Sequence, residues 1–212
     1  MDRSSRERMA YDSDGVKRSQ YTQRFPRSSR STRFLDELIM KYMQECEGKN
    51  VLEIGSNGWI AYIYNKNIKP KRLTCINISL SELNAGESFY HSENVNFPID
   101  FILMDANKLL FEDRRFDFVF GGAILHHLDI STAVSEISRV SKNSGAMLFH
   151  EPLGLNPFSA LIRSLTPSAR TLDEKPLFPK DINKIKRYFE LNLHFSEFMC
   201  VIPNIVLNFI LG

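Results

Sequence analysis

Short apolar runs alternate with amphipathic segments between about residues 48 and 152. The runs are bounded by polar residues, glycine or proline, which is typical of strands in a buried sheet. We predict strands over residues 51–55, 72–78, 99–104, 116–120 and 146–149. The segments between them have helical spacing, and we predict helices over residues 58–67, 79–91 and 129–142. Repeated strand–helix units predict an α/β fold with a doubly wound, mainly parallel sheet and helices on both faces.

The segments on either side of this region lack the alternation. Residues 1–33 carry nine Lys or Arg against four Asp or Glu and few aliphatic side chains, so we predict a basic arm, mostly loop, that can act as a lid. A helix over residues 32–46 follows the arm. After residue 152 we predict helices over residues 153–164 and 181–189, a loose strand over 191–201 and an apolar end. We therefore divide the chain into the arm (1–33) and one domain (34–212), with a core at 48–152 and a C-terminal helical extension at 153–212.

Composition excludes few classes of protein. A net charge of +2 does not favour nucleic acid, and we expect no such partner. Three widely spaced cysteines predict neither a disulfide framework nor a metal site, and they favour a reducing, cytoplasmic compartment. The charged beginning predicts no signal peptide, and no apolar run is long enough for a membrane-spanning helix. The apolar end can pack on the domain, join a partner, contact a membrane surface or mark a shortened chain; oligomeric state stays open.

Polar side chains and glycines gather where the predicted strands end. Glu53, Asn77, Asp105, Gly121 and Glu151 stand at or just after the ends of the predicted strands. In an open parallel sheet these ends lie at one edge, and that edge binds the ligand. The turn after the first strand contains two glycines, but its spacing does not match the dinucleotide fingerprint G-x-G-x-x-G. The sequence therefore predicts a ligand site at this edge.

Five short motifs in this order resemble those of class I S-adenosylmethionine-dependent methyltransferases. They are Glu53-x-Gly55-Ser56-Asn57-Gly58, Cys75-Ile76-Asn77-Ile78-Ser79, Met104-Asp105-Ala106-Asn107, Phe116-Asp117-Phe118-Val119-Phe120 with Ala123-Ile124-Leu125-His126-His127-Leu128, and Glu136-Ile137-Ser138-Arg139-Val140. The resemblance covers residues 48–152 and implies a Rossmann-like fold with S-adenosyl-L-methionine as cofactor.

The resemblance also implies which residues contact the cofactor. They are Glu53, Gly55, Ser56, Gly58, Asn77, Ile78, Asp105, Ala106, Gly121 and Gly122. Asp105 would accept the adenine amino group, and the two glycines after the fourth strand would pass close to the sulfonium. Asn77 stands where the family usually has an acid that bridges the ribose hydroxyls, so we expect weaker binding there. An amide still offers both an acceptor and a donor.

Three residues beyond the fourth and fifth strands are the catalytic candidates. A hydroxyl acceptor needs a base, and neutral imidazole suits that role near pH 7. We predict that His127, supported by Glu151, assists the nucleophile while His126 shapes the pocket. The alternatives are that either histidine packs or caps, and that Glu151 is a helix cap or one half of an ion pair.

The acceptor is expected to be a small molecule, anionic or aromatic. We predict substrate contacts from Tyr11, Tyr21, Trp59 and Asn156, the last because its segment resembles one bacterial subgroup of these enzymes. Trp59 could equally be a core residue. Methyl transfer to oxygen or nitrogen in a biosynthetic pathway is the leading interpretation. Departures at Asn57, Trp59 and Asn77 keep open a cofactor-binding scaffold without turnover, and a nicotinamide-dependent oxidoreductase is a weaker alternative.

Overall fold

The computed structural model describes residues 1–12, 29–55, 63, 67–155, 160, 164–165, 171 and 173–195. The predicted site residues Ser56, Gly58, Trp59, Tyr21 and Asn156 lie outside these ranges. So does most of each of the predicted helices over 58–67 and 153–164. The structure therefore does not test those predictions.

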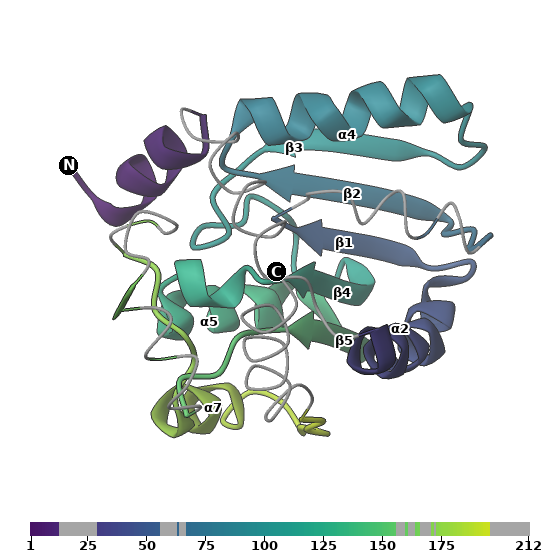
Figure 1. Ribbon diagram of the computed structural model, residues 1–212. Helices are drawn as coiled ribbons and strands as arrows, with labels where there is room; N and C mark the ends of the chain where they lie inside the picture. The colour runs from purple at the N-terminus through teal and green to yellow at the C-terminus, as the bar shows by residue number, and fades with distance from the viewer. Residues whose placement is uncertain are drawn as a thin grey trace, which may run out of the picture.

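Five parallel strands form one sheet in the order β3-β2-β1-β4-β5 (Figure 1). The strands are β1 (Asn50–Ile54), β2 (Arg72–Asn77), β3 (Ile99–Leu103), β4 (Phe116–Gly122) and β5 (Ser141–His150). The chain proceeds from β1 outward to β3 and then returns to place β4 on the other side of β1. This reversal is the switch point of a doubly wound sheet, so the predicted fold class is confirmed.

Helices cover both faces of the sheet because the strand side chains alternate between two apolar cores. Val51, Phe118 and Phe120 point to the core that also contains Leu35 and Ile39 of α2 (Ser29–Met43). Packed on that core as well are the partly buried aromatic side chains of α4 (Leu80–Glu93). The short helix η1 (Gln44–Cys46) joins α2 to the strands.

The opposite core contains the intervening strand residues, Leu52, Ile54 and Val119 among them, together with the apolar face of α5 (Ile130–Val140) and Ile185 of α7 (Pro179–Ile185). Asp129 caps α5 by accepting the backbone N–H of Thr132 at 2.9 Å. The predicted α5 and its apolar face are thus confirmed.

Four predicted elements differ from the structure. Residues 3–12 are helical rather than loop. β5 is longer than predicted because it begins directly after α5, at Ser141. α7 begins at Pro179 rather than Asp181, whose carboxylate instead accepts the N–H of Phe178 from inside the first turn. Residues 191–195 form no strand, and 196–201 lie outside the described residues.

The edge formed by the carboxyl ends of the strands is covered by three segments. These are the helix over residues 3–12, the short helix η2 (Leu125–His127) after β4, and residues 171 and 173–177. In Figure 1 the N-terminal helix lies beside this edge, toward which the strand arrows point. Among the helices that the structure describes, none has both the length and the apolar composition that a membrane span needs.

Candidate active site

The sheet places the predicted cofactor residues at one edge. Glu53 is near the end of β1, Asn77 ends β2, and Gly121 and Gly122 end β4. Asp105 follows β3 by two residues and Glu151 follows β5 directly. Because all five strands of the sheet are parallel, these positions lie together at the carboxyl edge.

Glu53 is a fully buried carboxylate at the centre of the sheet. It lies between Cys75 of β2 and Phe120 of β4 in the strand register. Its side chain has 0% exposure, and one carboxylate oxygen lies 3.2 Å from the Cys75 sulfur, which donates to it. A charge in this position requires polar partners, because burial without them is costly.

Gly55 and Gly121 are required by the packing of the chain itself. Gly55 has φ of +71°, a conformation that favours glycine. A Cβ there would approach the side chain of Ile124 to 2.6 Å, and one on Gly121 would lie 2.9 Å from the Ile54 carbonyl oxygen. Ile124, in the turn after β4, therefore already occupies the space that these two glycines leave open.

Asp105 presents a carboxylate of which both oxygens are engaged. Oδ1 accepts the backbone N–H of Asn107 at 2.8 Å and its side-chain amide at 2.9 Å. Oδ2 accepts the hydroxyl of Ser4, from the N-terminal helix, at 2.5 Å. The first oxygen is thus held by the turn, while the second faces a donor from a separate segment. The neighbouring Ala106 is buried.

The end of β2 carries a second polar group. The buried Asn77 accepts the backbone N–H of Ser79 through Oδ1 at 2.9 Å, across the half-buried Ile78. Ser79 caps α4, and its hydroxyl donates to Asp12 of the N-terminal helix at 2.5 Å. The N-terminal helix therefore contacts the chain beyond both β2 and β3.

Glu151 organises η2 and pairs with His126. One oxygen accepts the N–H groups of Ile124 and Leu125 at 2.9 and 2.8 Å. The other lies 2.8 Å from His126 Nδ1. The predicted pairing of Glu151 with His127 is therefore wrong. A carboxylate that accepts the free N–H groups of a helix start holds that helix in place, so Glu151 positions the turn bearing both histidines.

His127 is bonded to the N-terminal helix through both ring nitrogens. Its Nδ1 lies 3.0 Å from Glu7 Oε2, and its Nε2 lies 3.1 Å from the Tyr11 hydroxyl. The His127 and Glu7 side chains are only 6% and 5% exposed. The remaining oxygen of Glu7 accepts the Thr171 hydroxyl at 2.6 Å. Tyr11, a predicted substrate contact, is thus placed beside a predicted base.

The surroundings lower the pKa values of both His127 and Glu7. Burial lowers the pKa of His127 and outweighs the hydrogen bond to Glu7, which raises it. Burial would raise the pKa of Glu7, but the hydrogen bonds from His127 and Thr171 outweigh it. The pair is therefore a carboxylate beside a neutral imidazole near pH 7, with the imidazole able to accept a proton.

Arginines of the N-terminal helix bind the C-terminal extension. Arg6 forms a bidentate pair with Asp173 at 2.6 and 2.9 Å. Arg3 donates to the carbonyl oxygens of His126 and Asp173. These contacts dock the helix without touching the His127 ring, and they join three segments far apart in the sequence.

The sequence prediction missed Glu7, Ser4, Asp12 and Thr171. Ser4, Glu7 and Tyr11 recur at helical spacing, and that was the available signal. Because this face is polar rather than apolar, the segment has no hydrophobic periodicity that would identify it as a helix.

The described residues also include a cluster of possible metal ligands and a surface depression. His126, His127 and Glu174 each offer a ligand atom within 4.8 Å of the others, although the sequence predicted no metal site. Both nitrogens of His127 are already engaged, which leaves that ring without a lone pair for a metal in this arrangement.

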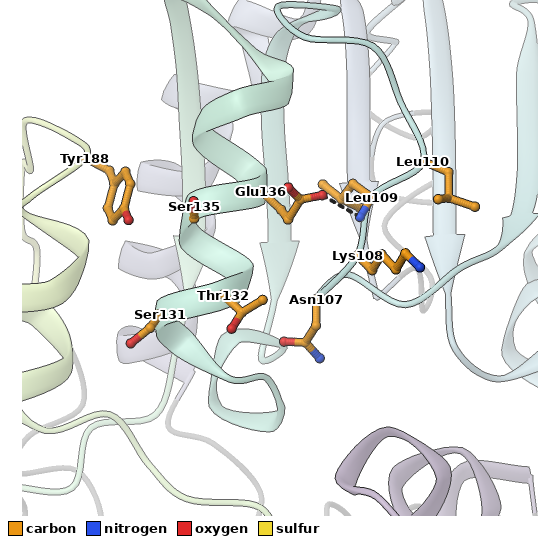
Figure 2. A pocket seen from close by; sticks show the side chains of 9 residues that line it. All are labelled: Asn107, Lys108, Leu109, Leu110, Ser131, Thr132, Ser135, Glu136 and Tyr188. Atoms are coloured by element: carbon orange, nitrogen blue, oxygen red, sulfur yellow. Dashed lines mark hydrogen bonds between the residues drawn. The ribbon is translucent and has the colours of Figure 1, made fainter.

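A depression of about 650 Å³ lies between α5 and the loop after β3. Figure 2 shows it lined by Asn107, Thr132, Glu136 and Tyr188, and the Glu136 carboxylate is directed at the Leu109 N–H.

Comparison with known proteins supports the resemblance noted in the sequence. A family model described as a methyltransferase domain matches residues 52–149. A ubiquinone/menaquinone biosynthesis C-methyltransferase of Bartonella bacilliformis is 34% identical over 106 residues, which are 48% of this chain and 40% of that protein. The chain spans less than half the length of the curated relatives it matches.

Solved structures share the fold. The YcgJ protein of Bacillus subtilis matches with a TM-score of 0.61 and 20% identity, over 74% of this chain and 68% of that one. The phosphoethanolamine N-methyltransferase 2 of Haemonchus contortus, in complex with phosphomonomethylethanolamine and S-adenosylhomocysteine, matches with a TM-score of 0.60 and 20% identity, over 73% and 36%. Residues 52–149 therefore match the methyltransferase domain family, in agreement with the class I S-adenosylmethionine-dependent methyltransferases that the sequence motifs resemble.

Proposed function

We propose that this protein transfers a methyl group from S-adenosylmethionine to the oxygen or nitrogen of a small-molecule acceptor in a biosynthetic pathway. The observation that carries the proposal is the His127 imidazole, held neutral and hydrogen-bonded to a hydroxyl at the carboxyl edge of a methyltransferase sheet. The phenol of Tyr11 shows that a hydroxyl fits 3.1 Å from Nε2, the distance at which a base can receive a proton.

The polar groups at the ends of β2 and β3 fit the adenosine part of the cofactor. Asp105 Oδ1 is held by Asn107, and Oδ2 meets a hydroxyl donor that an adenine amino group can replace. Asn77 and Ser79 supply an amide and a hydroxyl near the position expected for the ribose. The cofactor, when bound, supplies an electrophilic methyl group on a sulfonium.

The chain's own residues would orient the acceptor and hold its proton. The acceptor hydroxyl would take the place that the Tyr11 hydroxyl has beside His127 Nε2, and Nε2 would receive its proton as the acceptor oxygen attacks the methyl group. An amine that is neutral at the working pH needs alignment alone. The curated relatives are named for N-methyl and C-methyl transfer, so their names do not choose the acceptor atom for this chain.

Ligand binding tests the first half of the proposal. S-adenosylhomocysteine at a hundredfold excess over its Kd should raise the unfolding temperature by about 5–10 °C, because it binds only the folded chain. Asp105→Ala should weaken binding about tenfold, the scale of one or two hydrogen bonds. Asp100→Ala is the matched control, since Asp100 belongs to β3 but pairs with Arg72 near the start of β2.

Measurement of turnover tests whether the protein transfers the methyl group to an acceptor. With S-adenosylmethionine and pools of small acceptors, wild-type protein should accumulate S-adenosylhomocysteine and an acceptor heavier by one methyl group. Binding without product in any pool would favour the cofactor-binding scaffold. An unchanged unfolding temperature at millimolar ligand would remove the methyltransferase proposal.

A further inference from the structure

Glu7 is a buried acid on a surface helix, and the motif resemblance does not include it. Its side chain is 5% exposed, and its two oxygens accept from different segments, His127 of η2 and Thr171 of the extension. The other residues of 1–12 are exposed or partly exposed, and five of them are charged. A carboxylate buried in this way needs both hydrogen bonds to offset the loss of water.

We propose that Glu7 is a positioning residue for His127, fixing the proton on Nδ1 so that Nε2 faces the acceptor with its lone pair. The inference rests on the proposed function, in which His127 is the base. A carboxylate can only accept, so the Nδ1 that lies 3.0 Å from it must carry the hydrogen. Nε2 is then the acceptor nitrogen of the neutral ring, and the Tyr11 hydroxyl donates to it at 3.1 Å.

The arrangement makes the base dependent on the N-terminal helix. Glu7 and Tyr11 both belong to residues 3–12, so the His127 ring receives its Nδ1 partner only when that helix is docked. Second partners of this kind set the tautomer and orientation of functional histidines. The helix thus contributes to chemistry as well as covering the strand ends.

Other groups around His127 do not replace Glu7. His126 of the same short helix disfavours a charged His127, as burial does, whereas Glu174 of the extension favours it. Glu7 and the Tyr11 hydroxyl hydrogen-bond to the two nitrogens of the His127 ring. Docking of the helix has its own contacts, chiefly the Arg6–Asp173 pair. The role of Glu7 can therefore be separated from docking.

Three variants of the full chain make that separation. Glu7→Gln keeps an acceptor but removes the charge. Glu7→Leu removes both. Arg6→Gln is the matched control, because it loosens the same helix without touching His127. Circular dichroism and thermal unfolding confirm that each variant is folded before it is compared.

The first readout is ¹⁵N NMR of the His127 ring, assigned by the signals that disappear in His127→Asn. Wild type and Arg6→Gln should show a protonated Nδ1 and an unprotonated Nε2, while Glu7→Leu should show a mixture of tautomers. A wild-type ring protonated on Nε2 would overturn the proposal. This readout needs no methyl transfer, so it stands even if the proposed function fails.

The second readout is the pH profile of kcat/KM with a hydroxyl acceptor. Glu7→Gln should move the acid limb to lower pH by about half to one unit, since the negative charge that favours imidazolium is gone. Glu7→Leu should lower kcat about 10- to 100-fold with unchanged S-adenosylhomocysteine affinity. If Glu7→Leu and Glu7→Gln behave like Arg6→Gln in rate and profile, Glu7 is only a docking residue and the inference is overturned.

Discussion

His126 and His127 are adjacent in the chain but have different partners. His126 pairs with Glu151, whose carboxylate also holds the start of η2, whereas His127 pairs with Glu7 and Tyr11. The two ring centroids lie 4.1 Å apart with the ring planes tilted by 42°, yet the Nδ1 atoms face different carboxylates, Glu151 for His126 and Glu7 for His127. Two neighbouring side chains therefore have different roles. His126 pairs with the carboxylate that holds the turn, and His127 is the proposed base.

We predict that His127→Ala lowers turnover of a hydroxyl acceptor by about 10² to 10⁴, the range for loss of a general base, with cofactor affinity near wild type. In the wild type the acid limb should lie below pH 6.5, because burial lowers the pKa of His127 and activity needs the neutral ring. The turnover rate of both proteins, measured against pH, checks the loss of rate and the position of the acid limb. Calorimetry checks that cofactor affinity is unchanged.

The matched variant is His126→Asn, which retains a side-chain donor for Glu151 and should keep most of the rate. If His126→Asn is the inactive protein, the roles of the two histidines are exchanged. If neither variant slows transfer to a hydroxyl, catalysis proceeds by alignment alone.

Protonation of His127 also bears on stability. Its folded pKa lies below the value of an unfolded histidine, so the unfolded chain binds more protons in that range. The contribution of the neutral ring to the free energy of unfolding is therefore present above about pH 6.5 and is lost as pH falls through the folded pKa.

Asn77 is the second residue whose role can be measured. Its Oδ1 accepts the Ser79 N–H, so Asn77→Ala should remove that bond and weaken S-adenosylhomocysteine binding by about tenfold. Asn77→Asp keeps an acceptor for Ser79 and should bind as tightly as wild type or more tightly. Isothermal calorimetry measures the S-adenosylhomocysteine affinity of the wild type and both variants. Equal affinities would mean that the Asn77 side chain stabilises the turn and does not contact the ligand.

At the scale of elements, the helix over residues 3–12 shares its contacts with the proposed cofactor site. Ser4 binds Asp105, and Asp12 binds Ser79, the groups expected to meet the adenine and the ribose. Glu7 and Tyr11 of the same helix contact His127, the proposed base. The helix therefore touches both halves of the site at once.

We predict that Ser4→Ala leaves S-adenosylhomocysteine affinity unchanged or raises it by a few fold. The reason is competition, since the Ser4 hydroxyl and an adenine amino group would donate to the same Asp105 oxygen. Ser5→Ala is the control from the next position, where the backbone binds Asp2 rather than the site. Weakening by Ser4→Ala to the level of Asp105→Ala would show that Ser4 belongs to the ligand site instead.

For the whole molecule, the two apolar cores explain why the fold could be predicted. Alternate residues of β1 and β4 enter opposite cores, and α5 places its apolar stripe on one of them. Patterns with periods of 2 and 3.6 residues reflect burial directly, so they identify strands and helices without knowledge of their partners. Parallel strands then bring their polar ends to one edge, as predicted for Glu53, Asn77 and Asp105.

The polar contacts across that edge could not be predicted in the same way. The N-terminal helix buries polar side chains such as Glu7 through hydrogen bonds, which leave no hydrophobic period in the sequence. The predicted strand over residues 191–201 shows the converse, because a loose alternation is present while residues 191–195 have no strand pairing. The secondary structure of such segments depends on the neighbouring elements that they contact, not on their own hydrophobic pattern.

The sequence by itself determined the succession of strands and helices along the chain, the edge of the sheet that carries the polar groups, and the motifs of the methyltransferase domain. Each of these depends on local periodicity or on a turn, such as the positive φ at Gly55. Tertiary structure alone decided that Glu7 rather than Glu151 faces His127, and that residues 3–12 fold as a helix over the site. Those contacts join residues more than a hundred positions apart, and the geometry that selects them exists only once the sheet has formed.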